Sequence, residues 1–372
     1  MNKLRVGITG MPGFMGSHLR DRLVREEGIS VLAFEDSYFE QPDNLKAFLS
    51  EADVVAHLAA MNRGEPDEIY NVNVSLVKKL VAQMDELGVR PHVIFSSSIQ
   101  DALDNPYGRS KRDGERIFEE WSGRTNAPVT VLAIPNVYGD SGLPHYNSVV
   151  ATFCYELSHG AKPQIHVDKE LGLIYINELT EIILEAIESP PAGFEKVRVQ
   201  ETATIKVSGI LALLEKFRDY YFDKKIVPAF KNRFEQNLYT VFLTYLSNAD
   251  YQQKPTLHCD DRGTLFEVIK LEQGGQMFYS TTRPGIVRGN HYHSRKLEKF
   301  CVIKGAAIIR LRRIGTDNVI EYRVSGQEPA FVEMPIFYTH NIENVGQDDL
   351  HTLFWTNELY DPADPDTFYE QV

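Results

Sequence analysis

The stretch that decides the fold of the N-terminal half is Thr9-Gly10-Met11-Pro12-Gly13-Phe14-Met15-Gly16, which follows an apolar stretch and opens a helical one. Its three glycines have the spacing that permits a tight turn, a close approach of backbone to a pyrophosphate, and close packing of helix on strand. A diphosphate can then lie against the positive end of the helix. We therefore predict a dinucleotide-binding turn here.

Apolar stretches and amphipathic helical stretches alternate over the first 160 residues of the chain. The expected strands are Leu4–Thr9, Val31–Glu35, Val54–Leu58, Val93–Ser97 and Val129–Ile134. The expected helices are Ser17–Arg25, Val74–Leu87 and Arg109–Trp121, with further helical runs near Leu179–Ile187 and Ile210–Tyr221. Such alternation predicts an α/β fold with a Rossmann-type doubly wound parallel sheet.

Length and composition indicate two globular domains. The chain has 372 residues, 43% of them hydrophobic, and a formal net charge of −13. The negative charge argues against a nucleic-acid-binding surface, because phosphate contacts need clustered Lys and Arg.

Three scattered cysteines without C-x-x-C spacing indicate reduced thiols. No apolar run reaches the ~18 residues that would span a bilayer, so we expect a soluble, cytoplasmic protein without membrane contact.

The domain boundary is expected in the polar stretch Ser247–Pro255, which gives domains 1–247 and 250–372. Beyond it, glycines separate short stretches such as Ala306–Leu311 and Ile320–Val324, and no long helical pattern occurs. This pattern of short stretches separated by glycines predicts an all-β sandwich or barrel.

Two features near the glycine turn predict how a cofactor is held. Glu35 lies at the end of the second expected strand, where a carboxylate can bond both ribose hydroxyls and would repel a 2′-phosphate. This favours NADH over NADPH, although a solvated strand-end residue is the simpler alternative. Tyr107 and Lys111 are four residues apart and share a helical face, so the ammonium is expected to lower the pKa of the phenol. Ser96-Ser97-Ser98 ends the fourth expected strand.

A second constellation predicts a metal site. His291 and His293 are two apart on an expected strand and project from one face, and Glu298 and His340 can arrive from neighbouring strands. Three imidazoles and one carboxylate suit Zn²⁺, with other divalent transition metals possible.

Residues 1 to about 245 resemble the extended short-chain dehydrogenase/reductases that act on nucleotide sugars. The likeness rests on the glycine turn, His57-Leu58-Ala59-Ala60, Ser96–Ser98, Tyr107 with Lys111, and Pro135-Asn136-Val137-Tyr138-Gly139. It implies that Ser98 bonds the substrate carbonyl, that Tyr107 exchanges its proton, and that Lys111 tunes Tyr107 and holds the nicotinamide ribose. The remaining cofactor contacts would be Thr9, Gly10, Gly13, Phe14, Met15, Gly16, Leu58, Ala59 and Ala60. Asn136 is either a substrate contact or a turn former, and His57 is more simply a packed strand-end residue.

The C-terminal pattern resembles the cupins, matching the first of their two motifs at every position. In the second motif, Phe337 replaces a usual glycine. Asp260-Asp261-Arg262-Gly263 and Gly285–His291 further resemble the cupin epimerases of 4-keto-6-deoxy nucleotide sugars. That likeness implies that Arg262 and Arg288 face the substrate, whereas the simpler reading of Arg262 is a surface salt bridge.

Over its full length the chain resembles a family of bifunctional capsular polysaccharide enzymes in which a reductase is fused to a zinc cupin. Asp364-Pro365-Asp366-Thr367 belongs to this likeness. The resemblance implies C3 epimerisation of a UDP-4-keto-6-deoxy-N-acetylhexosamine in the cupin, then C4 reduction, usually with NADPH. The product would be a UDP-N-acetyl-6-deoxy-L-talosamine on the route to UDP-N-acetyl-L-fucosamine.

Two alternatives stay open. The cupin can be a structural, zinc-stapled dimerisation module beside an active reductase, or the chain can be a nucleotide-sugar sensor that binds cofactor without turnover. Zinc itself can be catalytic or structural. A homodimer is expected because cupin domains often pair through their sheets.

Overall fold

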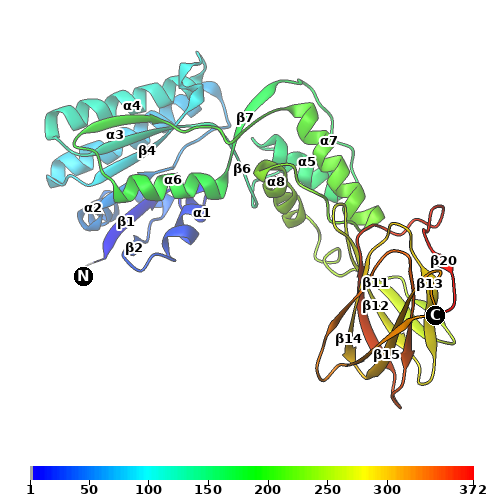
Figure 1. Ribbon diagram of the computed structural model, residues 1–372. Helices are drawn as coiled ribbons and strands as arrows, with labels where there is room; N and C mark the ends of the chain where they lie inside the picture. The colour runs from blue at the N-terminus through cyan, green and yellow to red at the C-terminus, as the bar shows by residue number, and fades with distance from the viewer. Residues whose placement is uncertain (1–2) are drawn as a thin grey trace. The chain divides into compact units, whose positions relative to one another are not determined.

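Six parallel strands form the central sheet of the N-terminal part, in the order β2-β1-β3-β4-β5-β8 (Figure 1). We describe residues 3–372 of a computed structural model. The strands are β1 (Leu4–Thr9), β2 (Ile29–Leu32), β3 (Val54–His57), β4 (His92–Ser98), β5 (Val129–Ile134) and β8 (Phe194–Arg198). All residues of β3, β4 and β5 are buried, as expected for strands covered by helices on both faces. The predicted doubly wound sheet is confirmed.

Five helices flank this sheet: α1 (Phe14–Leu23), α2 (Pro42–Glu51), α3 (Pro66–Leu87), α4 (Pro106–Thr125) and α6 (Ile176–Glu188). In Figure 1, α3 and α4 pack together on one face and α1 and α6 on the other. The core between α3, α4 and the sheet contains Phe95, Phe118 and Trp121. Among residues 3–372, no helix combines the length and the hydropathy that a membrane crossing requires.

A smaller sheet follows, in the order β6-β7-β9, formed by β6 (Asn136–Tyr138), β7 (Glu170–Tyr175) and β9 (Ala203–Lys206). β6 runs parallel to β7, and β7 runs antiparallel to β9. The other helices of this region are α5 (Val149–Ser158), α7 (Val207–Arg218) and α8 (Arg233–Thr244).

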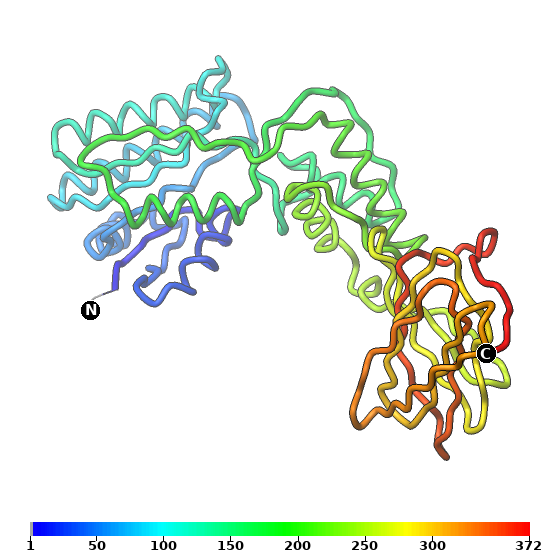
Figure 2. The backbone as a smooth tube through the Cα atoms, in the orientation of Figure 1, coloured from blue at the N-terminus to red at the C-terminus, as the bar shows by residue number. Residues whose placement is uncertain are grey.

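The C-terminal part consists of two antiparallel sheets, and the backbone path of this cupin-like fold can be followed in Figure 2. One sheet has the order β10-β11-β12-β19-β14-β17 and the other β16-β15-β18-β13-β20. The strands of the first are β10 (His258–Asp260), β11 (Gly263–Leu271), β12 (Gly275–Thr282), β19 (Leu350–Thr356), β14 (Glu298–Lys304) and β17 (Phe331–Met334). Those of the second are β16 (Val319–Ser325), β15 (Ala306–Arg313), β18 (Tyr338–Asn344), β13 (Val287–Tyr292) and β20 (Phe368–Tyr369).

The chain divides into two compact units, and each unit is formed by two separate segments of the sequence. The first contains Met1–Glu215 and Asn232–Leu246, and the second contains Lys216–Lys231 and Ser247–Val372. A helical segment from the end of α7 through the π-helical turn η3 (Asp219–Lys224) therefore groups with the β-rich unit. Nothing in the residue pattern indicated this grouping, and the functional domains 1–247 and 250–372 stay a prediction.

Glu272 holds that segment against the β-rich unit. Its Oε2 accepts hydrogen bonds from Lys216 Nζ at 2.9 Å and from the backbone N–H of Ala229 at 2.8 Å. Its Oε1 accepts from the Tyr220 hydroxyl at 2.8 Å. Burial alone would raise the pKa of Glu272, but these donors, with the Lys216 charge, lower it overall. The ionised carboxylate is thus part of the folded structure.

We predict that Glu272→Gln lowers the free energy of unfolding of the β-rich unit by about 1.5–3 kcal/mol at pH 7, because a charged acceptor with three donors is lost. Since the folded-state pKa is depressed, the wild-type advantage is present above the unfolded pKa of about 4.3 and disappears as the pH falls through the folded-state value. Urea denaturation between pH 3 and 7 measures both effects.

The matched control is Glu333→Gln, whose carboxylate pairs with Lys299 at 2.7 Å on the surface. It is expected to change stability by less than about 1 kcal/mol. Equal losses in the two variants would contradict the role given to Glu272.

Candidate functional site: a dinucleotide turn and a metal cluster

The glycine turn joins β1 to α1 as predicted. Gly10 has a φ of +70°, which favours glycine, and a Cβ placed on Gly16 would lie 2.2 Å from the Gly10 carbonyl oxygen. α1 begins at Phe14, with Gly13 as its N-cap residue and Met15 in its first turn. The N-terminal end of α1 can therefore receive a diphosphate.

The end of β3 packs against this turn. Thr9 Oγ1 lies 2.7 Å from His57 Nδ1 and accepts a hydrogen bond from the backbone N–H of Ala59 at 3.3 Å. A Cβ on Gly10 would meet the Ala59 backbone at 2.8 Å. Burial lowers the pKa of His57 to about 3, so its ring is neutral and serves packing. Leu58 is buried beside it and Ala60 is partly exposed.

Glu35 is not at the end of a strand, and that part of the prediction is wrong. β2 ends at Leu32, and Glu35 is the exposed N-cap residue of the short helix η1 (Asp36–Glu40). Its Oε2 accepts a hydrogen bond from Ser37 Oγ at 3.4 Å. Strand pairing with β1 stops after the partners Gly7 and Leu32, which leaves the following three residues in a loop.

Three serines at the end of β4 have different roles. Ser96 Oγ donates to the His57 carbonyl at 3.0 Å, and Ser97 Oγ donates to Glu115. Ser98 Oγ accepts from the backbone N–H of Gln100 at 3.1 Å, as the N-cap of η2 (Ile99–Ala102). Among the described residues this is the only hydrogen bond of the Ser98 hydroxyl, so the hydroxyl proton stays available to an acceptor such as a carbonyl.

Tyr107 and Lys111 lie in the first turns of α4. Asn105 caps this helix through its Oδ1, which accepts from the Gly108 N–H at 2.7 Å, and Pro106 occupies the first helical position. Lys111 is buried, donates to the Ser96 carbonyl at 2.7 Å, and lies 5.5 Å from the centre of the Tyr107 ring.

The predicted lowering of the Tyr107 pKa is contradicted. Burial raises the pKa of Tyr107 to about 12, and burial lowers the pKa of Lys111 to about 8. The Lys111 ammonium is over the face of the phenol ring and directs a hydrogen bond to a carbonyl, so it does not offset the desolvation of the phenolate. A protonated Tyr107 is suited to donate a proton.

Asn136 begins β6 and its Nδ2 donates to the Gly172 carbonyl at 3.0 Å. It lines a cavity of about 280 Å³ together with Asn147, Ser148, His166 and Lys169. Polar groups on an otherwise apolar wall suit a small polar ligand. The position is consistent with a substrate contact and also with a structural bond.

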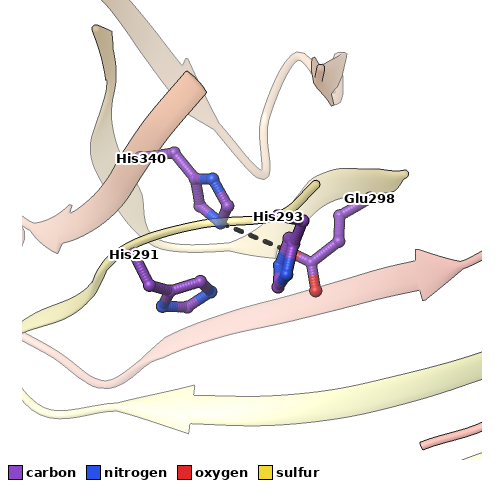
Figure 3. A group of neighbouring side chains, drawn as sticks. All are labelled: His291, His293, Glu298 and His340. Carbon is purple, nitrogen blue, oxygen red and sulfur yellow. Dashed lines mark ion pairs between the residues drawn. The ribbon is translucent and has the colours of Figure 1, made fainter. Parts of the chain in front are cut away.

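The four predicted metal ligands come together inside the C-terminal unit (Figure 3). One potential ligand atom from each of His291, His293, Glu298 and His340 lies within 4.8 Å of all the others. His291 and His340 come from the neighbouring strands β13 and β18. Glu298 lies on a strand as predicted, at the start of β14 in the other sheet, whereas His293 follows the end of β13 and does not lie on the predicted strand.

The ligand atoms satisfy each other poorly without a cation. Glu298 Oε2 is 3.1 Å from His340 Nε2 and 3.3 Å from His293 Nε2. All three atoms are buried and have no hydrogen-bond partner among the described residues. A buried carboxylate converging with imidazole nitrogens fits a divalent transition metal, which would be held by all four side chains.

A β-bulge places Arg288 on the same interior face as the cluster. The register of β13 against β18 shifts between Gly289 and His291, so that Arg288 pairs with Ile342 and His291 with His340. Residues an odd number apart on a regular strand would face opposite sides. The extra residue is Asn290, with a φ of +60°.

The Arg262 guanidinium binds Asp260 through Nε at 3.0 Å and Nη2 at 2.6 Å, which matches the simpler salt-bridge reading. Asp260 Oδ1 also lies 3.5 Å from Arg288 Nη2 and so links β10 to β13. Arg288 Nε is buried without a partner among the described residues.

Strand register reveals further interior residues that sequence reasoning missed. Gln276, Thr356 and Glu298 form one row across β12, β19 and β14. Gln276 Nε2 and Thr356 Oγ1 are buried without partners among residues 3–372. The next interior row contains partly exposed aromatic rings, those of Phe278, Phe354 and Phe300. Only a known register could have identified these residues, because alternation alone does not say which strands are neighbours.

Fold and site together define a two-part enzyme in which an NAD(P)-binding extended reductase unit is joined to a cupin with a metal-ligand cluster. The model of the NAD dependent epimerase/dehydratase family matches residues 6–199, and that of the polysaccharide biosynthesis C-terminal domain matches residues 258–368.

Individual proteins match over the whole chain. UDP-2-acetamido-2,6-beta-L-arabino-hexul-4-ose reductase from Pseudomonas aeruginosa is 32% identical and covers 98% of both chains. The crystal structure of the capsular polysaccharide assembling protein CapF from Staphylococcus aureus is 35% identical, with a TM-score of 0.87 over 99% of this chain and 100% of that one. CapF with the inhibitor 3-isopropenyl-tropolone is 31% identical, with a TM-score of 0.83 over 99% of this chain and 100% of that one.

The chain belongs to the NAD dependent epimerase/dehydratase family, and to the full-length group with a polysaccharide biosynthesis C-terminal domain that includes CapF. The predicted whole-chain resemblance is therefore confirmed. So is the prediction of an NAD(P)-dependent nucleotide-sugar enzyme.

We predict that the chain binds one zinc ion tightly and that His291→Asn weakens this binding. The loss should exceed the ~10–100-fold that loss of an outer-shell partner costs, because a ligand itself is removed. Metal content after dialysis and competition with a chromophoric chelator measure the effect.

The matched control is His258→Asn, which changes an exposed histidine at the start of β10. It should bind zinc as the wild type does. If the wild type and both variants retain equal amounts of metal, His291 is not a ligand.

Proposed function

We propose that the chain carries out two consecutive reactions on a nucleotide sugar. The cupin unit inverts C3 of a UDP-4-keto-6-deoxy-N-acetylhexosamine, and the N-terminal unit then reduces the C4 ketone with NAD(P)H. The product is a UDP-N-acetyl-6-deoxy-L-talosamine on the route to UDP-N-acetyl-L-fucosamine. The observation that carries this proposal is the presence in one chain of two separate sets of reactive side chains, around Tyr107 and around His291.

The substrate class is supported by the relatives. The Pseudomonas aeruginosa relative is named for the reduction of a UDP-linked 4-keto sugar of L configuration, and the family match covers the reductase unit. The 4-keto group of such a sugar acidifies the neighbouring C3 proton, so inversion at C3 is chemically accessible before the ketone is reduced. We assign that step to the cupin unit.

Three side chains act in the reduction. The nicotinamide cofactor supplies the hydride when it is bound. Ser98 donates a hydrogen bond from its hydroxyl to the O4 carbonyl, and Tyr107 transfers its proton to O4 as negative charge develops there. Lys111 holds the phenol and the nicotinamide ribose in place, and its positive charge favours the phenolate that remains.

The interior of the cupin suits the epimerisation. The C4 ketone acidifies the C3 proton, and a bound metal would supply Lewis acidity that stabilises the enediolate. Gln276 and Thr356 offer unpartnered polar atoms beside Glu298, and these would hold sugar oxygens. Arg288 and Arg262 would bind the diphosphate, with Arg262 exchanging its bond to Asp260 for one to phosphate.

The alternative is a reductase whose cupin is only a structural zinc module. The nearly complete burial of His293, Glu298 and His340 favours it, since structural sites are closed. The partly exposed row of Phe278, Phe354 and Phe300 favours an interior that admits a ligand. We give the exposed row more weight, because a packed structural core would bury all three rings.

Cofactor choice and assembly remain part of the proposal. Glu35 is exposed and carries a negative charge, which favours NADH, whereas the family resemblance implies NADPH. We propose zinc as the metal, a homodimer as the assembly, a UDP-sugar as the substrate and the cytoplasm as the location.

We predict that Tyr107→Phe lowers kcat for reduction of the 4-keto sugar by about 10²–10⁴-fold, because the proton donor is removed. Cofactor binding should change little, since the ring remains. Oxidation of NADPH or NADH at 340 nm and fluorescence titration of the cofactor measure the two quantities.

The control variant is Tyr70→Phe, which removes a hydroxyl that donates to Asp113 at 2.5 Å between α3 and α4. It should turn over at the wild-type rate. Wild-type turnover by Tyr107→Phe would rule out the proposed reductase site, and absence of cofactor oxidation by the wild type would favour a sensor.

A further inference from the structure

Asp366 belongs to the segment Asp364-Pro365-Asp366-Thr367, to which the proposed reactions assign no role. It is 4% exposed, which is unusual for an aspartate, and its φ is +42°. A buried charge and a left-handed backbone both cost free energy, so contacts around Asp366 must compensate for them.

The Asp366 carboxylate binds the loop that joins two metal ligands. Its Oδ1 accepts from the backbone N–H of Ser294 at 3.1 Å and from Ser294 Oγ at 2.5 Å. Its Oδ2 accepts from the backbone N–H groups of Arg295 and Lys296, both at 2.9 Å. These three residues lie between His293 and Glu298, so the carboxylate fixes the path of the chain from one ligand towards the other.

The Asp366 main chain orients the ligand itself. Its carbonyl oxygen lies 2.5 Å from His293 Nδ1. A carbonyl can only accept, so Nδ1 carries the proton and Nε2 is the nitrogen that faces Glu298 Oε2 at 3.3 Å. This is the arrangement in which a second hydrogen bond sets the tautomer and the ring orientation of a metal-bound histidine.

The residues that follow Asp366 contact the two strands that carry His291 and His340. In β20, Tyr369 pairs with His291 and Phe368 with Tyr292. The Glu370 N–H donates to the Asn290 carbonyl at 3.0 Å. The Glu370 carbonyl accepts from Thr339 Oγ1, the residue before His340. Residues 364–372, which we name the C-terminal strap, thus contact the backbone next to every histidine ligand.

We propose that the C-terminal strap is the outer shell of the metal site, with Asp366 as its main positioning residue, and that metal binding and strap docking stabilise each other. The inference rests on the metal site of the proposed function but needs neither the substrate nor the epimerisation. Because the strap positions the metal ligands, altering the strap should lower the affinity of the site for metal. By linkage, removing the metal should weaken the docking of the strap.

The test is Asp366→Asn. Asparagine has nearly the same side-chain size as aspartate and tolerates a positive φ. We expect the zinc dissociation constant to rise about 10–100-fold, measured by competition with a chromophoric chelator. The control is Asp364→Asn, whose exposed carboxylate pairs with Arg295 at 2.8 Å and should leave the constant within about twofold of the wild type.

A second measurement uses the unaltered protein, so that a folding defect in the variant does not decide the result. We would follow hydrogen exchange by mass spectrometry with and without a zinc chelator. Removing the metal should accelerate exchange more in residues 364–372 than in β15. Equal zinc affinity in both variants, or strap exchange unaffected by chelation, would overturn the proposal. Neither readout depends on turnover, so loss of the proposed epimerase activity leaves this inference separately testable.

Discussion

The C-terminal unit depends on a single electrostatic constraint, the convergence of one carboxylate and three imidazoles between its two sheets. Glu298 Oε2 is 3.1 Å from one ring nitrogen and 3.3 Å from another, and none of these atoms has a hydrogen-bond partner among the described residues. Burying such groups unpaired is costly, whereas a shared divalent cation satisfies them together. Both sheets, the bulge at Asn290 and the contacts of Asp366 serve to bring these atoms to one point.

The N-terminal unit solves a comparable problem with a buried cation of its own. Lys111 lies between the end of β4 and the first turns of α4, where burial lowers its pKa to about 8 and its ammonium donates to a main-chain carbonyl. Burial also raises the pKa of Tyr107 to about 12. In both units, groups that destabilise an ordinary core occupy the place where reactivity is expected, and the surrounding helices and strands fix their positions.

The features that the sequence predicted well are those with local signals. The glycine turn, strands β1 and β5 with their bounds, and the grouping of the four candidate metal ligands all follow from spacing within a few residues or from a motif. Features that depend on long-range pairing were missed. The end of β2 and therefore the place of Glu35, the bulge at Asn290, and the interior position of Gln276 depend on register between strands far apart in sequence. The Tyr107 pKa depends on burial, which spacing does not reveal.

The claim that both units are catalytic is tested most directly by proton NMR of the purified chain with a UDP-4-keto-6-deoxy-N-acetylhexosamine in D₂O, without nicotinamide cofactor. Our account predicts that the C3 proton signal disappears faster than in an enzyme-free sample, because epimerisation requires proton exchange but no hydride. A C3 signal that persists while added NADPH or NADH still leads to reduction of the ketone would contradict the account, and would leave the cupin as a structural module.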